Sequence, residues 1–248
     1  LHAIRQEGEQ CLQPTAFMQS THNIISATVA IDLKCHAYNT TYVHRGTSFE
    51  NALLDALLRL RSGSIRNALL GGFDELTDDY LQFFRRTGRW QFTPDGFAGE
   101  AAVSFLLDGQ QDAHTLCRLD DLRLLYRPTP DTLRHALHDL LTANACSLGD
   151  IDAVLIGLNT NPDNDTVYLD AAAQLYPTTP LIRYKHLFGE SFSASALAHY
   201  VAATCLRRGH IPSHLRLDSA AASLPARRIL IHNHSMNKTH TLTLLSAC

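Results

Sequence analysis

The stretch Tyr38-Asn39-Thr40-Thr41-Tyr42-Val43-His44-Arg45-Gly46 decides how this chain is interpreted, because it predicts a strand that turns sharply into a helix. Its first six residues are mostly β-formers. After the turn, Thr47-x-x-Glu50 is typical of a capping box that begins a helix. Strand-turn-helix elbows hold a Ser or Cys against the positive end of a helix in several folds. This elbow offers Val43 and His44 instead, so it lacks the usual attacking group.

The segments around the elbow alternate between predicted strands and predicted helices, which favours a layered α/β fold. Hydrophobic spacing predicts helices over 17–33, 47–61, 77–86, 131–143, 166–175 and 193–208. It predicts strands over 38–43, 67–72, 101–107, 116–127, 151–157, 181–184, 228–232 and 239–245. The helix over 193–208 is rich in alanine, and such small side chains predict a helix packed deep between sheets.

Length and composition indicate a large core divided into two similar halves. The chain has 248 residues, of which 45% are hydrophobic. A polar break at 108–112 separates two runs of similar element order, so we predict halves at 1–110 and 111–248. Because the first residue is Leu1 and not Met, we expect the natural protein to be longer at its N-terminus.

Charge and cysteine usage exclude several classes of protein. The net charge of −3 argues against nucleic-acid binding, which needs a basic face. No apolar run reaches the length of about 20 residues that spans a membrane. The six cysteines are scattered without a C-x-x-C pair, which is typical of free thiols in a cytoplasmic protein and does not favour disulfides or zinc.

Several segments, in this order and spacing, resemble the β-ketoacyl synthases of the thiolase fold over nearly the whole chain. They are the elbow at 40–46, Gly71-Gly72-Phe73-Asp74-Glu75, the glycine-rich 95–102, Lys185 with Gly189, and Gly209-His210-Ile211-Pro212. The resemblance implies layers in the order α-β-α-β-α and two similar halves, with the N-terminal part of the fold missing from this chain.

The departures from that family carry the functional interpretation. Family members use a Cys and two His, and the matching positions here are Val43, Leu158 and Glu190. The glycine-rich loop near the C-terminus is replaced by Ser235-Met236-Asn237-Lys238. Val43 cannot attack a thioester, and a carboxylate at 190 would repel a malonyl carboxylate. The resemblance therefore implies no catalytic residue, no cofactor and no metal.

This pattern resembles the non-catalytic ketosynthase-like subunits called chain-length factors. The Gln-, His- and Asn-rich sequence, such as Gln19 to Asn23, is most similar to the ketosynthase-like proteins of aryl-polyene and flexirubin pigment clusters. It implies a role in polyketide or fatty-acid-like biosynthesis, with an acyl carrier protein as a further partner. The dimer partner would be a catalytic ketosynthase or a second copy, paired through the strand from Tyr38 to Tyr42. The side chains expected to shape the tunnel and elbow are Tyr42, Val43, His44, Gly46 and Phe49.

Two other functional hypotheses stay open at this point. One is an active condensing or acyl-transfer enzyme with a non-standard site around His44 or His22, to which Lys185 would contribute. The other is a structural relic that is kept only for assembly. Loss of acyl transfer in His44→Ala would favour the enzyme, whereas a deletion strain with an unchanged product would favour the relic.

Other clusters of polar residues have simpler structural explanations. His232-Asn233-His234 places two imidazoles on one face of a strand, yet no further metal ligand follows nearby. Asp74, Glu75, Asp78 and Asp79 lie where acidic residues cap helices. The arginine pairs at 85–86, 207–208 and 227–228 are solvated surface or, as a hypothesis, points where an acidic carrier protein docks.

Overall fold

The computed structural model describes residue 8 and residues 14–218 and 222–248. It divides into two compact units, Leu1–Val43 and His44–Cys248. Each unit is described by itself below. The division that the sequence predicts at residue 110 stays a prediction.

The first unit contains two short helices where the sequence predicts one. Helix α2 spans Pro14–Gln19 and α3 spans Ile24–Asp32. Between them, the hydroxyls of Ser20 and Thr21 donate to the carbonyls of Phe17 and Met18 at 2.7 and 2.8 Å. Hydroxyls that bond to the preceding turn compete with the regular helical pattern. The expectation of one continuous helix over 17–33 is therefore wrong.

The segment from Tyr38 to Val43 forms no strand within the described residues, contrary to the prediction. It is linked instead to α3 by two side-chain hydrogen bonds. Asn39 Nδ2 donates to the carbonyl of Ser26 at 2.9 Å, and Ser26 Oγ lies 2.9 Å from Thr41 Oγ1. A β-forming sequence becomes a strand only where another strand is available to pair with it. Within the part of the chain that the structure describes, no strand lies in register with that segment.

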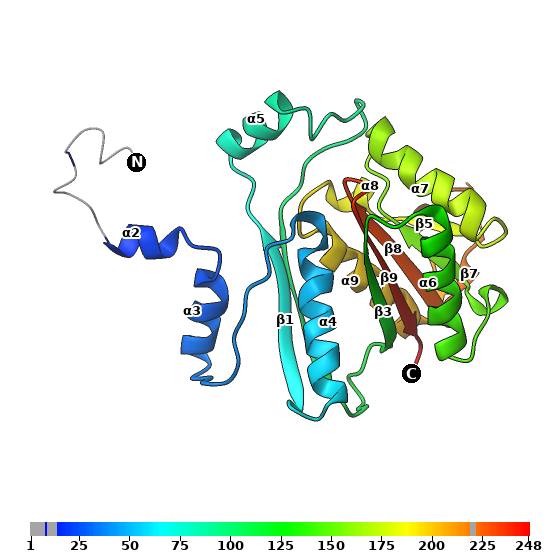
Figure 1. Ribbon diagram of the computed structural model, residues 1–248, viewed down its shortest axis with the longest axis horizontal. Helices are drawn as coiled ribbons and strands as arrows, with labels where there is room; N and C mark the ends of the chain where they lie inside the picture. The colour runs from blue at the N-terminus through cyan, green and yellow to red at the C-terminus, as the bar shows by residue number, and fades with distance from the viewer. Residues whose placement is uncertain (1–7, 9–13, 219–221) are drawn as a thin grey trace. The chain divides into compact units, whose positions relative to one another are not determined.

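The second unit is built around a five-stranded mixed sheet with the order β3-β9-β8-β4-β5 (Figure 1). Its strands are β3 (Arg118–Tyr126), β4 (Ala153–Ile156), β5 (Leu181–Arg183), β8 (Arg228–Ser235) and β9 (Thr239–Ser246). Strand β4 runs parallel to both β5 and β8, whereas β9 is antiparallel to β8 and β3. Because parallel strands need helical crossovers, helices cover both faces of this sheet.

Alternating side chains of the sheet supply two separate cores. Ala153 and Leu155 of β4 face α9 (Ala194–Arg208), whereas Val154 and Ile156 face α6 (Pro130–Ala143) and α7 (Pro162–Leu175). All four β4 side chains are fully buried. Helix α6 begins at Pro130 after the cap Thr129, whose hydroxyl accepts from Thr132 N. The predicted order of strands and helices is thus confirmed over this half of the chain.

Helix α9 lies between the large sheet and a two-stranded antiparallel sheet of β1 (Asn67–Asp74) and β2 (Ala101–Asp108). Helix α4 (Ser48–Arg61) packs beside it against β1 (Figure 1). A side-chain carbon at Gly72 would come within 2.8 Å of the Ala196 methyl, so the close approach requires small residues. The deep position predicted for the alanine-rich helix is confirmed. Strand β1 is longer than predicted and alternates between exposed and partly buried residues.

The remaining elements are short. They are α5 (Asp78–Arg86), α8 (Lys185–Phe188), β6 (His210–Ile211), β7 (Leu224–Pro225), and the 3-10 turns η2 (Arg45–Thr47), η3 (Leu148–Asp150) and η4 (Ser213–Leu215). In the acidic cluster, Asp74 accepts from Ser193 N at 2.7 Å, a contact distant in sequence, whereas α5 is capped by Thr77, whose hydroxyl accepts from Tyr80 N. No helix in the described part of the chain is long and apolar enough to cross a membrane.

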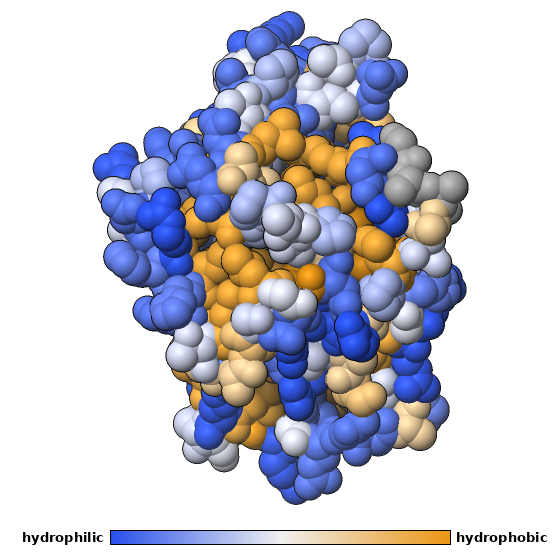
Figure 2. Space-filling view, turned by 90° about the vertical axis from the view of Figure 1, so that its right-hand side faces the viewer, coloured by the Kyte–Doolittle hydropathy of each residue, from blue (hydrophilic) through white to orange (hydrophobic). Residues whose placement is uncertain are grey.

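One face of the second unit keeps apolar surface next to water. Figure 2 shows it from the side on which α7 lies, with apolar residues in the middle and hydrophilic ones around them. Leu169 of α7, for example, is exposed. Because apolar atoms contribute roughly half or more of an ordinary protein surface, this face alone indicates no partner.

The capping box predicted at the start of α4 does not form, because Glu50 turns into the core. Thr47 makes no capping bond, and its hydroxyl donates to the carbonyl of His44 at 3.1 Å. The Glu50 carboxylate is fully buried and accepts from Asn233 Nδ2 at 2.7 Å and Thr241 Oγ1 at 3.3 Å. Burial raises the pKa of Glu50, with the hydrogen bond from Asn233 opposing it.

The His-x-His sequence of β8 belongs to a buried histidine cluster and to no metal group that the described residues form. His232 Nε2 lies 3.1 Å from His240 Nδ1, and His232 Nδ1 lies 2.7 Å from Tyr176 Oη. His234 Nε2 lies 3.1 Å from the carbonyl of Asn164. Burial lowers the pKa of His234 to about 3 and of His240 to about 4, so these imidazoles are neutral at pH 7.

Replacing the buried carboxyl by an amide should make stability less dependent on pH. Because folding raises the pKa of Glu50, the folded protein holds that proton more tightly than the unfolded chain. The unfolding free energy therefore falls as pH rises through and above the ordinary carboxyl pKa of about 4.3. We expect the unfolding free energy of Glu50→Gln, minus that of the native protein, to increase as pH rises from 4.5 to 8. Urea unfolding at several pH values measures this difference.

Glu75→Gln, which removes a carboxyl outside this network, is the control and should show no such trend. A constant difference between Glu50→Gln and the native protein across that pH range would contradict the assignment.

Candidate functional site

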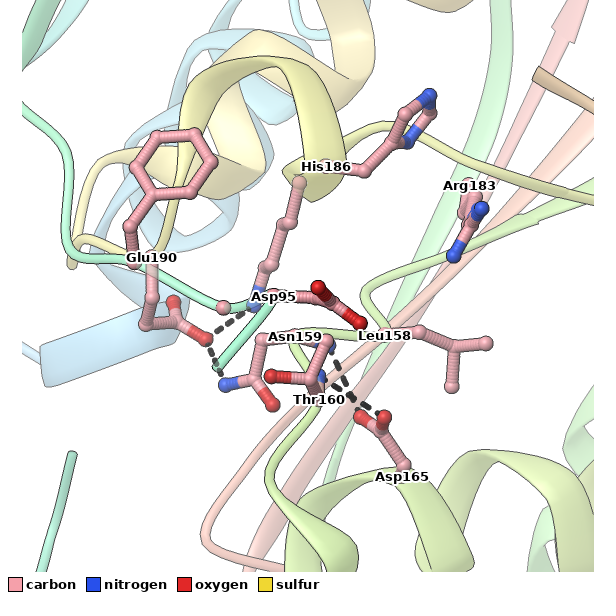
Figure 3. Close-up of a pocket in the computed structure, with 11 residues that line it drawn as sticks. Asp95, Leu158, Asn159, Thr160, Asp165, Arg183, His186 and Glu190 are labelled. Carbon is pink, nitrogen blue, oxygen red and sulfur yellow. Dashed lines mark hydrogen bonds and ion pairs between the residues drawn. The ribbon is translucent and has the colours of Figure 1, made fainter. Parts of the chain in front are cut away.

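A small cavity lies at the carboxyl ends of β4 and β5 (Figure 3). It has a volume of about 60 Å³. The loop after β4, the short helix after β5 and a glycine-rich loop that follows α5 form its wall. The lining residues are Asp95, Gly96, Phe97, Leu158, Asn159, Thr160, Asp165, Arg183, Lys185, His186 and Glu190. The ends of parallel strands are where α/β proteins most often place a ligand.

Three residues singled out in the sequence meet in this cavity. Leu158 follows β4, Lys185 begins α8 after β5, and Glu190 comes just beyond α8. Lys185 Nζ lies 2.7 Å from Glu190 Oε2, and their side chains are 6% and 12% exposed. Asn159 Nδ2 donates to the same carboxylate oxygen. An ammonium and a carboxylate with little contact with water neutralise each other at the centre of the site.

The loop after β4 is held rigidly by one carboxylate of α7. Asp165 accepts from the backbone N–H groups of Asn159 at 2.9 Å and Thr160 at 3.0 Å. Asn161 caps the helix by accepting from Asn164 N. Asp165 therefore fixes the loop that presents Leu158 and Asn159 to the cavity.

The glycine-rich loop covers the cavity through direct backbone contacts. Glu190 N donates to the carbonyl of Phe97, and Gly99 N donates to the carbonyl of Glu190, both at 2.9 Å. A side-chain carbon at Gly96 would overlap Thr160 Oγ1, and one at Gly99 would overlap the carbonyl of Phe188. Only glycine allows this packing, which explains the glycine-rich sequence at 95–102.

The structure adds cavity residues that sequence reasoning did not single out, above all Arg183, His186 and Asp95. Arg183 Nε and Thr160 Oγ1 are buried without a hydrogen-bond partner among the described residues. Burial, followed by the charge of Arg183, lowers the pKa of His186. Their position at the end of β5 and just after it was the available signal, because polar residues that follow a buried parallel strand converge at one edge of the sheet.

The elbow residues of the second unit have structural roles. Gly46 lies in the turn η2, where its carbonyl accepts from Asn233 Nδ2 at 2.8 Å. Phe49 is buried and packs on Phe105 and His199, with ring centroids 5.5 and 4.9 Å away. His44 is exposed and begins the unit, with its backbone N–H donating to Ser48 Oγ. His44 is not among the residues that line the cavity.

The other predicted residues belong to the first unit. Tyr42 and Val43 end that unit, and His22 lies in the turn between α2 and α3. Within the second unit, the residues that line the cavity include no cysteine. The cavity therefore presents charged, amide and imidazole groups, one hydroxyl and two apolar side chains.

Comparison of the fold with solved structures gives strong matches. The ishigamide ketosynthase/chain length factor aligns with a TM-score of 0.77 at 18% identity, covering 99% of this chain and 70% of that one. The ketosynthase ApeO in complex with its chain length factor ApeC, from Xenorhabdus doucetiae, gives 0.80 at 16% identity, covering 100% and 69%. A β-ketoacyl synthase from Burkholderia phymatum STM815 gives 0.75 at 14% identity, covering 100% and 71%.

This chain has a ketosynthase-like fold. The predicted thiolase-type α/β architecture is thereby confirmed over essentially the whole chain. At these low identities the likeness concerns the fold. No protein-family model matches the chain, and no curated protein matches its sequence.

Within this ketosynthase-like fold, the buried ion pair should be energetically coupled. Lys185→Met leaves Glu190 as an uncompensated buried charge, and we expect a loss of about 3–5 kcal/mol in unfolding free energy. The double variant Lys185→Met/Glu190→Gln removes both charges and should be more stable than Lys185→Met alone. Chemical denaturation at pH 7 measures both.

The control is Arg134→Met, which removes an exposed ion pair with Asp131 and should have little effect. Additive effects of the two changes at Lys185 and Glu190 would show that the pair is not coupled.

Proposed function

We propose that this chain is a non-catalytic ketosynthase-like subunit, a chain-length factor that works with an active ketosynthase. The observation that carries the proposal is the cavity at the ends of β4 and β5. Leu158 and Glu190, which stand at the two histidine positions of the family, line that same cavity. Their convergence supports the alignment at both positions.

The chemistry of the cavity opposes the decarboxylation that condensing enzymes carry out. An active site needs hydrogen-bond donors aimed at the developing enolate oxygen. Leu158 has no donor, and Glu190 is an acceptor that already takes Lys185 and Asn159. Asp95 and Asp165 add further carboxylates to the wall. At the position of Glu190 a malonyl carboxylate would meet a group of like charge, whereas the guanidinium of Arg183 in another part of the wall would attract it.

The proposed partner is based on the composition of the segment from Tyr38 to Tyr42. This segment has the residues of a strand but forms no strand among the described residues. We propose that it pairs with the equivalent segment of a catalytic ketosynthase, or of a second copy, across a two-fold axis. Two of the matched structures are described as containing a ketosynthase together with a chain length factor.

An acyl carrier protein is the second proposed partner. One matched structure is described as an acyl carrier protein in complex with its ketosynthase. In this chain, α5 ends with Arg85 and Arg86, and Arg89 follows. All three arginines are exposed and lie just before the glycine-rich loop that covers the cavity. An acidic carrier protein would be attracted to this end of the molecule.

Co-expression with candidate ketosynthases tests the proposal. We expect a stable complex with one of them. After incubation with an acyl carrier-protein thioester, intact-mass spectra should show the acyl group on the ketosynthase chain and none on this chain. Replacing the 38–42 segment by Gly-Ser of equal length should abolish the complex, whereas Arg134→Met should not.

The alternative is an enzyme with a non-standard site around His44 or His22. This alternative predicts that the isolated chain transfers acyl groups and that His44→Ala or His22→Ala abolishes the transfer. A covalent acyl group on the isolated chain would replace the proposal by this alternative.

Phe49, in the first turn of α4, is proposed to limit product length by filling space that a growing chain would otherwise occupy. Phe49→Ala opens a cavity beside Phe105 and His199, and in the complex we expect the main product to become longer by at least one extension unit. Leu57→Ala, on the same face of α4, is the control. Both changes should cost about 2–5 kcal/mol of stability, so only the position of the cavity differs. Equal product lengths in the two variants would contradict the role of Phe49.

A further inference from the structure

A second concave site lies at the opposite end of the five-stranded sheet. It is a groove of about 320 Å³ lined by Arg118, Arg227, Arg228, Gly149, Asp150, Ser246 and Ala247. Strands β4 and β8 run parallel and both begin at this end, whereas the cavity described above lies where β4 finishes. The groove is therefore separate from the candidate functional site, and the proposed function does not use it.

Three guanidinium groups converge on the groove because of strand register. Arg118 and Arg228 both pair with Ser246, one from each neighbour of β9, so they flank the same point of the sheet. Arg227 immediately precedes β8. Its side chain is 80% exposed and that of Arg118 is 67% exposed, so both guanidinium groups are accessible to a ligand from solvent.

The carboxylates that balance these arginines lie beneath them. Asp120, at 4% side-chain exposure, pairs with Arg118, and Asp152, at 6%, lies 3.3 Å from Arg227. Asp152 also accepts from the backbone N–H groups of Arg227 and Arg228 at 2.7 and 2.9 Å. Asp152 thus fixes the start of β8 and Asp120 contacts β9 through Ser246, while Arg118 and Arg227 are exposed to solvent.

Arg228 supplies the observation that points to a ligand. Its Nε is buried and has no hydrogen-bond partner among the described residues. A guanidinium N–H that is removed from water without an acceptor is costly, so an oxygen bound in the groove would favour a turn of the Arg228 side chain that brings this N–H to an acceptor. Each planar guanidinium can donate two parallel hydrogen bonds to a pair of oxygens of an oxyanion.

We propose that this groove binds a small phosphate monoester through Arg118, Arg227 and Arg228. Phosphate offers several strong acceptor oxygens at once, which suits three guanidinium groups better than a single carboxylate does. The groove is at the lower end of the range for small-molecule sites, roughly 300–1,000 Å³, so it has room for an organic group beside the phosphate.

The carboxylate of Asp150 also lines the groove, and its replacement gives an independent test of the proposal. Asp150 accepts from the backbone N–H and the hydroxyl of Ser147, both at 2.8 Å. These hydrogen bonds, from the backbone first, lower its pKa, so it is charged at pH 7. Because that charge opposes an anionic ligand, Asp150→Asn should tighten binding while keeping an acceptor oxygen for Ser147.

Calorimetric titration of the whole chain with ribose 5-phosphate and with inorganic phosphate, at pH 7.5 and low salt, tests the proposal. We expect saturable 1:1 binding, tighter for the ester. Arg228→Gln should weaken it at least about tenfold, and Arg118→Gln by a similar factor. Arg134→Gln, which removes an equal, exposed charge on α6, is the control and should leave affinity unchanged.

Binding should also weaken as salt rises, because two of the arginines are exposed. Absence of saturation with both probes, or equal losses in Arg228→Gln and Arg134→Gln, would overturn the proposal. If Arg228→Gln does not fold, unchanged affinity in both Arg118→Gln and Asp150→Asn would overturn it equally. Tighter binding of inorganic phosphate than of the ester would reject a monoester site.

Discussion

The buried ion pair between Lys185 and Glu190 is the interaction on which the functional interpretation depends. It lies where two strand ends of a ketosynthase-like sheet meet, and each partner compensates the charge of the other. Asn159 adds a hydrogen bond to the same carboxylate oxygen. Because Lys185, Glu190 and Asn159 bind one another, they hold the shape of the cavity. Leu158 offers no hydrogen-bond donor at its position.

The fold positions this pair through a simple packing constraint. Helix α9 consists largely of small residues and is buried between the two sheets, with Gly72 nearly touching Ala196. That arrangement brings β1, β2 and their glycine-rich connection toward the end of the large sheet. Gly96 and Gly99 then allow the loop to lie directly on Thr160 and Phe188 and to cover the cavity.

Much of this architecture was predictable from sequence, because buried strands, alanine-rich helices and glycine contacts each leave a local pattern. The order of motifs identified the fold. Leu158 and Glu190 were predicted as positions of one site together with Val43, and Lys185 was predicted for a residual site with His22. Of these residues, Leu158, Lys185 and Glu190 line the cavity, whereas Val43 and His22 belong to the first unit. The strand predicted from Tyr38 to Val43 failed because strand formation needs a neighbour. The capping role of Glu50 failed because its partners, Asn233 and Thr241, are far away in sequence. Asp95 was missed for the same reason: only tertiary contact brings it to the cavity.

The most direct test of the central claim is the rate at which the isolated chain decarboxylates a malonyl carrier-protein thioester. If Glu190 repels the malonyl carboxylate and Leu158 provides no donor, the rate at pH 7 will equal that of the thioester without protein. A saturable rate well above that background, retained after rigorous removal of contaminating synthases, would contradict the assignment of this chain as a non-catalytic subunit.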